Sequence, residues 1–154
     1  MPDTPPQDEL LTRLLDMVPF AARLGVAFTE AGPDRVGGTL DWSPDVCTAG
    51  AVLHGGALMS LADTVGAVCA FLNLPSGATT STVESKTNFF RAVRAGTARA
   101  VARPLHVGGS FVVVQTEVYD DEGRLVGQTT QTQAVLSPGR AGGRSAGCAR
   151  CEPA

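Results

Sequence analysis

Aromatic residues are scarce in this chain of 154 residues, at 5% of the sequence, and neither sign of charge dominates it. Proteins that bind single-stranded nucleic acid stack bases on aromatic rings, and proteins that bind duplexes cluster basic charge. The net charge of this chain is −3 at pH 7. The composition therefore argues against a nucleic-acid partner.

Long hydrophobic runs are also missing. The longest apolar stretch, residues 52–71, is interrupted by His54, by a Gly-Gly pair and by Asp63, whereas a membrane-spanning helix needs about 20 mostly apolar residues. The first ten residues, MPDTPPQDEL, lack the apolar centre of a secretory signal peptide. We therefore expect no membrane segment and a cytoplasmic location.

Residues that bind zinc are few, with four cysteines and two histidines. Without an export signal, we expect the cysteines, Cys47 and Cys69 among them, to be reduced. Cys148 and Cys151 have the C-x-x-C spacing of zinc ligands, but a structural site needs two more ligands, and only two histidines are present. We expect no metal, and the sequence assigns this pair no role.

The chain reads as one domain between two tails. Residues 1–7 are rich in proline, and residues 137–154 are rich in glycine, arginine and alanine, so we expect both segments to be disordered. The length of the remainder, residues 8–136, suits a single domain with a hydrophobic core.

Two helical patterns occur within this domain. Apolar residues at helical spacing predict one helix from about Asp8 that stops at Pro19, and a second from about Gly55 to Leu72. Segments rich in β-branched residues and separated by turn sequences predict antiparallel strands at residues 26–31, 35–42, 79–90, 97–107, 110–120 and 124–136. The prediction is an α+β domain with a long helix among five or six antiparallel strands. Short turns between the strands that come after the long helix favour a meander there.

The second predicted helix contains two unfavourable features. Asp63 lies on a helix that is apolar nearly all round and therefore buried; burial raises the pKa of a carboxyl group toward that of a general base. Gly55 and Gly56 open the helix, where free N–H groups and the helix dipole can stabilise a carbonyl oxygen that gains charge. The alternatives are a structural aspartate bonded to its neighbours and a tight turn into the helix.

The distance between these features has a consequence. Gly55 and Asp63 are eight residues apart, which is about 12 Å along a helix axis. The two groups therefore cannot act directly on one carbonyl from the same helix. If they share a reaction, two copies of the helix must pack antiparallel, with Asp63 of one facing Gly55 of the other, in a homodimer with two interfacial sites.

The segment VLHGGALMSLADTVGA resembles the H-G-G-x5–6-[AV]-[DE] signature of PaaI-like acyl-CoA thioesterases of the hotdog fold, which include 4-hydroxybenzoyl-CoA thioesterases. TNFFRAVRAG, with Asn88 and Arg91, resembles the family strand N/S-F-x-R-P, and residues 105–135 resemble its last two strands. The resemblance covers about residues 20–136. It implies the hotdog fold, with a long helix wrapped by an antiparallel sheet and dimers that often pair as tetramers.

The resemblance also implies catalytic roles. Asp63 would attack the thioester carbonyl or activate a water to do so, the Gly55 N–H would polarise that carbonyl, and His54 would shape the loop. Thr48 stands where the family usually has Asn or Gln, so a hydroxyl would only partly replace the amide. The family's later hydroxyl position is alanine here, and Thr82 is our candidate to orient the water.

Coenzyme A carries phosphates, and the span from residue 86 to residue 103 holds five basic residues and no acidic one: Lys86, Arg91, Arg94, Arg99 and Arg103. They are expected to form a phosphate-binding strip or a charged strand edge. The hairpin HVGGS offers further backbone donors. The candidate substrate-binding residues are Gly56, Thr82, Asn88, Arg91, His106, Val107, Gly108, Gly109 and Ser110, and candidates for the acyl pocket are Phe71, Phe89, Phe90 and Phe111.

These features favour hydrolysis of an aromatic or medium-size acyl-CoA to the free acid and coenzyme A, without a metal or an organic cofactor. One alternative is a non-catalytic acyl-CoA-binding hotdog protein, which the missing amide at Thr48 supports. Another is a hotdog enoyl-CoA hydratase or acyl-carrier dehydratase, against which the HGG-to-Asp spacing argues. The acyl group, the dimer or tetramer state, and attack by Asp63 or by water stay open.

Overall fold

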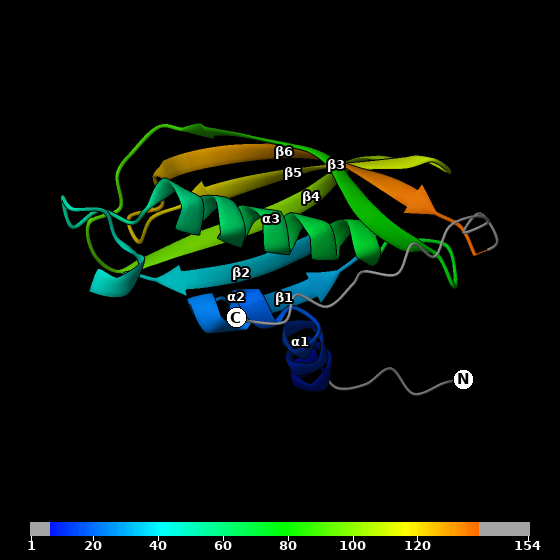
Figure 1. Cartoon of the computed structure of the whole chain (residues 1–154), viewed down its shortest axis with the longest axis horizontal. Helices are drawn as coiled ribbons and strands as arrows, with labels where there is room; N and C mark the ends of the chain where they lie inside the picture. The colour runs from blue at the N-terminus through cyan, green and yellow to red at the C-terminus, as the bar shows by residue number, and fades with distance from the viewer. Residues whose placement is uncertain (1–6, 139–154) are drawn as a thin grey trace, which may run out of the picture.

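The computed structural model describes residues 7–138 and consists of a long helix lying across one six-stranded sheet (Figure 1). The strands are antiparallel throughout, in the order β1-β2-β4-β5-β6-β3. Their bounds are β1 Ala27–Gly32, β2 Arg35–Asp41, β3 Thr79–Phe89, β4 Thr97–Val107, β5 Phe111–Tyr119 and β6 Leu125–Leu136. The helices are α1 Gln7–Asp16, α2 Pro19–Leu24, the 3-10 turn η1 Pro44–Val46 and α3 Gly55–Phe71. The predicted α+β class is confirmed.

Helix α3 packs against all six strands and provides most of the core's helical side. Small residues on the facing strands allow the close approach. A Cβ on Gly38 of β2 would lie 2.6 Å from Cγ2 of Val65, and β4 turns only alanines inward, at Ala98, Ala100 and Ala102. Strands β2 and β4 thus present small or apolar residues to the helix at the places of closest approach.

Pro19 has a different effect from the one predicted. The first helix ends at Asp16, and Pro19 then starts a second short helix, α2, instead of only stopping the first. Proline suits this position because its missing N–H would have no partner in the first turn of a helix and its φ is already helical. Gly25, at a φ of 94°, ends α2. Helix α2 contacts α3, whereas α1 packs mainly against β1 and α2 (Figure 1).

The strand order corrects the predicted meander. Strands β4, β5 and β6 follow one another as neighbours, but β3 pairs with β6 at the far edge of the sheet instead of with β4. Turn composition shows where a chain reverses but not which strand it returns beside, because pairing depends on the whole sheet. Strand β3 is consequently an edge strand, and most of its residues are exposed.

The predicted tails lie mostly outside the described residues, as do Cys148 and Cys151. Gln7, which we assigned to the leader, is the first residue of α1, and β6 ends at Leu136 as expected. Within residues 7–138 the longest helices fall short of the length and apolar character that crossing a membrane requires.

Candidate active site

The first turn of α3 carries one unused amide. The side chain of His54, the N-cap residue, accepts a hydrogen bond through Nδ1 from the Gly56 N–H at 2.8 Å. The His54 carbonyl accepts the N–H groups of Ala57 and Leu58. Within the described residues, Gly55 is therefore the first-turn residue whose N–H has no partner. Gly56, a predicted substrate contact, already donates to His54.

The Gly55 amide opens onto a pocket of about 370 Å³ that Phe89, Phe90 and Arg91 also line. A Cβ at Gly55 would lie 3.3 Å from Cζ of Phe89, which is tighter than ordinary van der Waals contact. Glycine at this position therefore keeps the amide open to a ligand. The predicted oxyanion donor has a suitable position at the positive end of the longest helix.

Asp63 lies about two turns further along α3 and is half-buried. Removal from solvent raises the pKa of its carboxyl group, and a hydrogen bond from the side chain of Gln131 partly lowers it again. The Gln131 Nε2 donates to Oδ1 of Asp63 and, at 3.3 Å, to its backbone carbonyl. The predicted rise in pKa is confirmed in direction, and a higher pKa makes the ionised carboxylate a stronger base.

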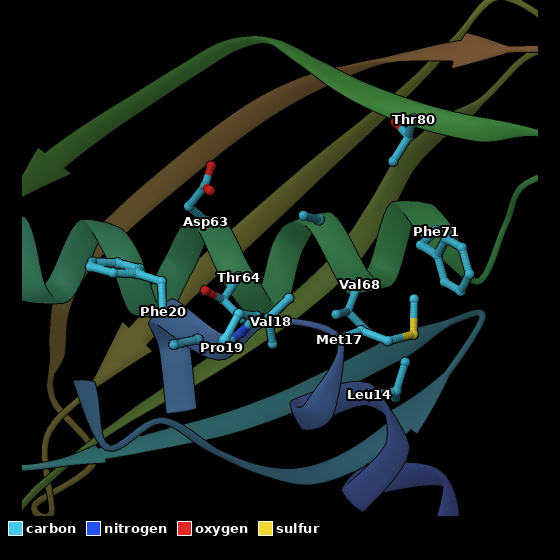
Figure 2. Close-up of a pocket in the computed structure, with 12 residues that line it drawn as sticks. Leu14, Met17, Val18, Pro19, Phe20, Asp63, Thr64, Val68, Phe71 and Thr80 are labelled. Atoms are coloured by element: carbon cyan, nitrogen blue, oxygen red, sulfur yellow. The ribbon is translucent and has the colours of Figure 1, made fainter. Parts of the chain in front are cut away.

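Asp63 borders an apolar cavity of about 400 Å³ between α3 and the first two helices (Figure 2). Figure 2 shows Asp63 on the side of α3 that faces β3, with the side chains of α1 and the α1–α2 link approaching α3 from below. Besides Asp63, the polar residues that line the cavity are Thr64 and Thr80. The apolar residues that line it include Leu14, Met17, Val18, Phe20, Val68 and Phe71. The contribution of the first helices was not predicted.

Gly55 and Asp63 do not line a common pocket within one chain. The pocket at Gly55 and the cavity at Asp63 share no lining residue. Their separation follows from their positions on one straight helix. A single protomer therefore offers a base and an amide donor at two different places.

Two predicted partners of the reacting groups lie elsewhere. Thr48 is in an exposed turn before α3, and its Oγ1 accepts the Gly50 N–H at 3.4 Å. It lines neither of the two pockets. The hydroxyl of Thr82 accepts a hydrogen bond of 2.8 Å from Gln133 Nε2. Thr80, two residues earlier on the same strand, lines the cavity with Asp63 instead.

The predicted coenzyme A contacts are spread over the molecule. Asn88 is exposed on β3, and Arg91 donates through Nη1 to the Leu125 carbonyl at 2.8 Å. The hairpin of residues 106–110 joins β4 to β5 at the end of the sheet opposite the start of α3 (Figure 1). The basic residues form no continuous strip, since β5 and β6 separate Lys86 on β3 from Arg99 and Arg103 on β4.

Of the four phenylalanines considered for the acyl pocket, only Phe71 lines the cavity beside Asp63. Phe89 and Phe90 line the pocket of Gly55, and Phe111 lies at the start of β5, outside both.

Gln131, which binds Asp63, was not predicted. Its sequence signal is a polar residue at an inward position of the alternating strand QTTQTQAV, where an apolar residue is the norm.

This geometry suits acyl transfer to water. A carboxylate with a raised pKa can remove a proton from water, and an open amide at a helix N-terminus can stabilise the oxyanion that forms on a carbonyl. The neighbouring cavity is apolar and can hold a hydrocarbon group.

Comparison with known proteins agrees with this chemistry. Residues 50–127 match the thioesterase superfamily. The 1,4-dihydroxy-2-naphthoyl-CoA hydrolase of Escherichia coli is 32% identical over 113 residues, which is 73% of this chain and 83% of that protein. The proofreading thioesterase EntH of Cronobacter sakazakii is 30% identical over 113 residues, or 73% of this chain and 82% of that protein.

The fold has the same relatives. A crystal structure of a thioesterase from Haemophilus influenzae superposes with a TM-score of 0.79 at 27% identity, covering 88% of this chain and 93% of that one. The resemblance stated from the HGG-to-Asp motif is thereby confirmed. The chain belongs to the thioesterase superfamily, has its hotdog fold, and is a thioester hydrolase.

Proposed function

We propose that this protein hydrolyses an acyl-CoA thioester to the free acid and coenzyme A, with Asp63 of one protomer and the Gly55 amide of a second acting on the same carbonyl. The observation that carries the proposal is the half-buried carboxylate of raised pKa beside an apolar cavity. The Escherichia coli relative is a 1,4-dihydroxy-2-naphthoyl-CoA hydrolase, which supports coenzyme A as the thiol.

The reaction follows from these groups. Ionised Asp63 takes a proton from water while the water oxygen bonds to the thioester carbon, and the carbonyl oxygen becomes an oxyanion at the Gly55 N–H. When the carbonyl re-forms, the C–S bond breaks and the leaving sulfur takes the proton from Asp63. Direct attack by Asp63 would instead give an anhydride that water then opens. The raised pKa of Asp63 suits either route, because a more basic carboxylate is both a stronger base and a stronger nucleophile.

The shared site requires a second copy of the chain, and two features of the surface support the formation of a dimer. Strand β3 has a free edge, and Val83, Phe89 and Phe90 are exposed along it and just beyond its end. Met59 is exposed on α3, one turn from Asp63. Pairing the β3 edges of two copies would bury these groups and bring the two α3 helices close together. A further pairing into tetramers stays a prediction, as do the cytoplasmic location and the lack of a cofactor.

The proposal is tested by release of free coenzyme A from a panel of acyl-CoA thioesters, followed with a thiol-trapping reagent. Steady release with one or more members is expected. Tight binding of acyl-CoA without thiol release would identify the non-catalytic alternative. Hydration of an enoyl-CoA, seen as loss of its ultraviolet absorbance without thiol release, would identify the hydratase.

Mixed dimers test whether two protomers share each site. Chains with Asp63→Asn and chains with Gly55→Pro are co-expressed with different tags and purified as heterodimers. One of the two sites in each heterodimer then has an intact Asp63 from one chain and an intact Gly55 from the other. We expect about half of wild-type turnover, whereas each variant alone should retain about 1% of it or less. Inactive heterodimers would contradict the shared site.

The cavity beside Asp63 is proposed to hold the acyl group, and Ala67 tests this. Ala67 lines the cavity one turn after Asp63, so Ala67→Phe should fill part of it. We expect kcat/KM for aromatic and medium-chain acyl-CoA to fall by about tenfold or more relative to that for acetyl-CoA. An unchanged preference across the acyl-CoA panel would place the acyl group elsewhere.

A further inference from the structure

Strand β6 places polar side chains under α3 where a core would normally be apolar. Thr129, Gln131 and Gln133 alternate along the strand and are all buried, with Gln131 at 0% exposure. A buried amide is costly unless its hydrogen bonds are made. Gln131 directs both of its recorded bonds at one residue, Asp63, through Nε2.

We propose that Gln131 is a positioning residue that holds the Asp63 carboxylate in one orientation at the border of the apolar cavity. This inference rests on the proposed role of Asp63 as the base. An ionised carboxylate only accepts hydrogen bonds, and the Gln131 amide supplies a donor from a fully buried position on β6. Because this bond comes from the sheet, it fixes the Asp63 side chain relative to the core.

Gly66 provides an independent observation in favour of this role. It lies one turn after Asp63 in the middle of α3, where glycine disfavours a helix. A Cβ at this position would overlap Oε1 of Gln131 and would lie 3.0 Å from Oγ1 of Thr116. The glycine therefore leaves the space that the amide needs to reach Asp63 from below the helix.

The orientation of the amide is also determined by its surroundings. With Nε2 toward Asp63, Oε1 faces Gly66 and has no hydrogen-bond partner among the described residues, and Oγ1 of Thr116 is likewise unpaired. The reverse orientation would set Oε1 against the carboxylate oxygens, where two acceptors repel. The side chain therefore satisfies its donor at Asp63 and leaves its acceptor without a partner among the described residues.

Gln131→Met tests the proposal, because methionine keeps the length of the side chain and removes the amide. The lost bond should leave desolvation of Asp63 less opposed, so its pKa rises further. We expect kcat to fall by about tenfold or more with little change in KM. The acid limb of the kcat–pH profile should move to higher pH, which a merely structural role of Gln131 would not cause.

Thr129→Val is the matched control. Thr129 is buried on the same face of β6, two residues from Gln131, and shares a hydrogen bond of 2.7 Å with Thr87 instead of Asp63. This variant also removes one buried hydrogen bond from the strand. We expect a lower melting temperature but a wild-type kcat–pH profile.

Gly66→Ala reaches the same bond from the helix side. The added methyl group should displace the Gln131 amide without changing either polar residue, while alanine favours the helix. We expect the same movement of the acid limb as for Gln131→Met, and this variant decides the matter if Gln131→Met does not fold. Folded variants at both positions with wild-type kcat and pH profile would overturn the positioning role.

Asp63→Asn separates this proposal from the proposed function. If Asp63→Asn is inactive while Gln131→Met behaves like wild type, only the positioning role fails. If Asp63→Asn keeps wild-type turnover, Asp63 is no base, and both the catalytic assignment and the positioning role are overturned.

Discussion

Asp63→Asn is expected to lower kcat by about 10³-fold and, at the same time, to make the protein more stable at pH 7. Asparagine cannot accept the proton of the attacking water, which removes the general base. Its side-chain oxygen can still accept the hydrogen bond that Gln131 donates to Oδ1 of Asp63, so the fold around α3 is retained. Release of free coenzyme A measures the first effect, and thermal unfolding measures the second.

The expected gain in stability follows from the pKa of Asp63. Desolvation raises that pKa in the folded state above its value in the unfolded chain, so the unfolded chain loses its proton first as pH rises. The free energy of unfolding therefore falls between the unfolded and the folded pKa of Asp63 and stays lower above both. The asparagine variant lacks this loss, so its advantage should appear at neutral pH and vanish in acid.

Activity should rise with pH over the range in which the free energy of unfolding falls. The ionised form of Asp63 is the base, so kcat of the wild type should fall as pH is lowered through the raised pKa of this residue. Asp34→Asn, in the exposed turn between β1 and β2, is the control and should match wild type in both respects. Two results would contradict the assignment of Asp63 as the base: full activity of Asp63→Asn, or an Asp63→Asn protein that is less stable than wild type at pH 7.

Gly55→Pro is expected to lower kcat by about 10²–10³-fold, the usual effect of removing one oxyanion donor. Proline lacks the N–H but suits the site in other respects. Gly55 is the first residue of α3, a position that proline favours, and His54 before it has φ −62° and ψ 136°, the extended conformation that a following proline requires. The substitution therefore removes the amide proton with little disturbance of the helix.

Gly55→Ala is the matched control for this variant. Both substitutions add a Cβ, which would lie 3.3 Å from Cζ of Phe89, but alanine keeps the N–H. We expect Gly55→Ala to lose much less turnover than Gly55→Pro in the coenzyme A release assay, and both variants to retain the melting temperature within a few degrees of wild type. Equal losses in the two variants would mean that the added bulk, and not the amide, matters.

Local patterns predicted the elements of this fold closely. The long helix was expected from Gly55 to Leu72 and runs to Phe71, and the predicted strands have the observed bounds within one or two residues. Helical spacing and β-branched alternation act over a few neighbours, so a linear sequence records them directly. Pro19 was misread because a proline both ends one helix and begins the next, and local pattern alone does not say which.

Both residues that we propose as catalytic could be identified in the sequence. Gly55 and Asp63 stand out because each opposes the helix that contains it, one by conformational freedom and the other by charge. Their spacing on one helix already excluded direct action on a common carbonyl, and the structure indeed gives them separate pockets.

Only the tertiary structure decided what surrounds these two residues. It set β3 beside β6 and separated Lys86 from Arg99, although the intervening sequence is uniformly free of acidic residues. It put Thr80 instead of Thr82 at the cavity, placed residues of the first two helices along the same cavity, and joined Gln131 to Asp63. The physical reason is range: helix and strand propensities are local, whereas strand order and pockets arise from packing between segments far apart in the chain.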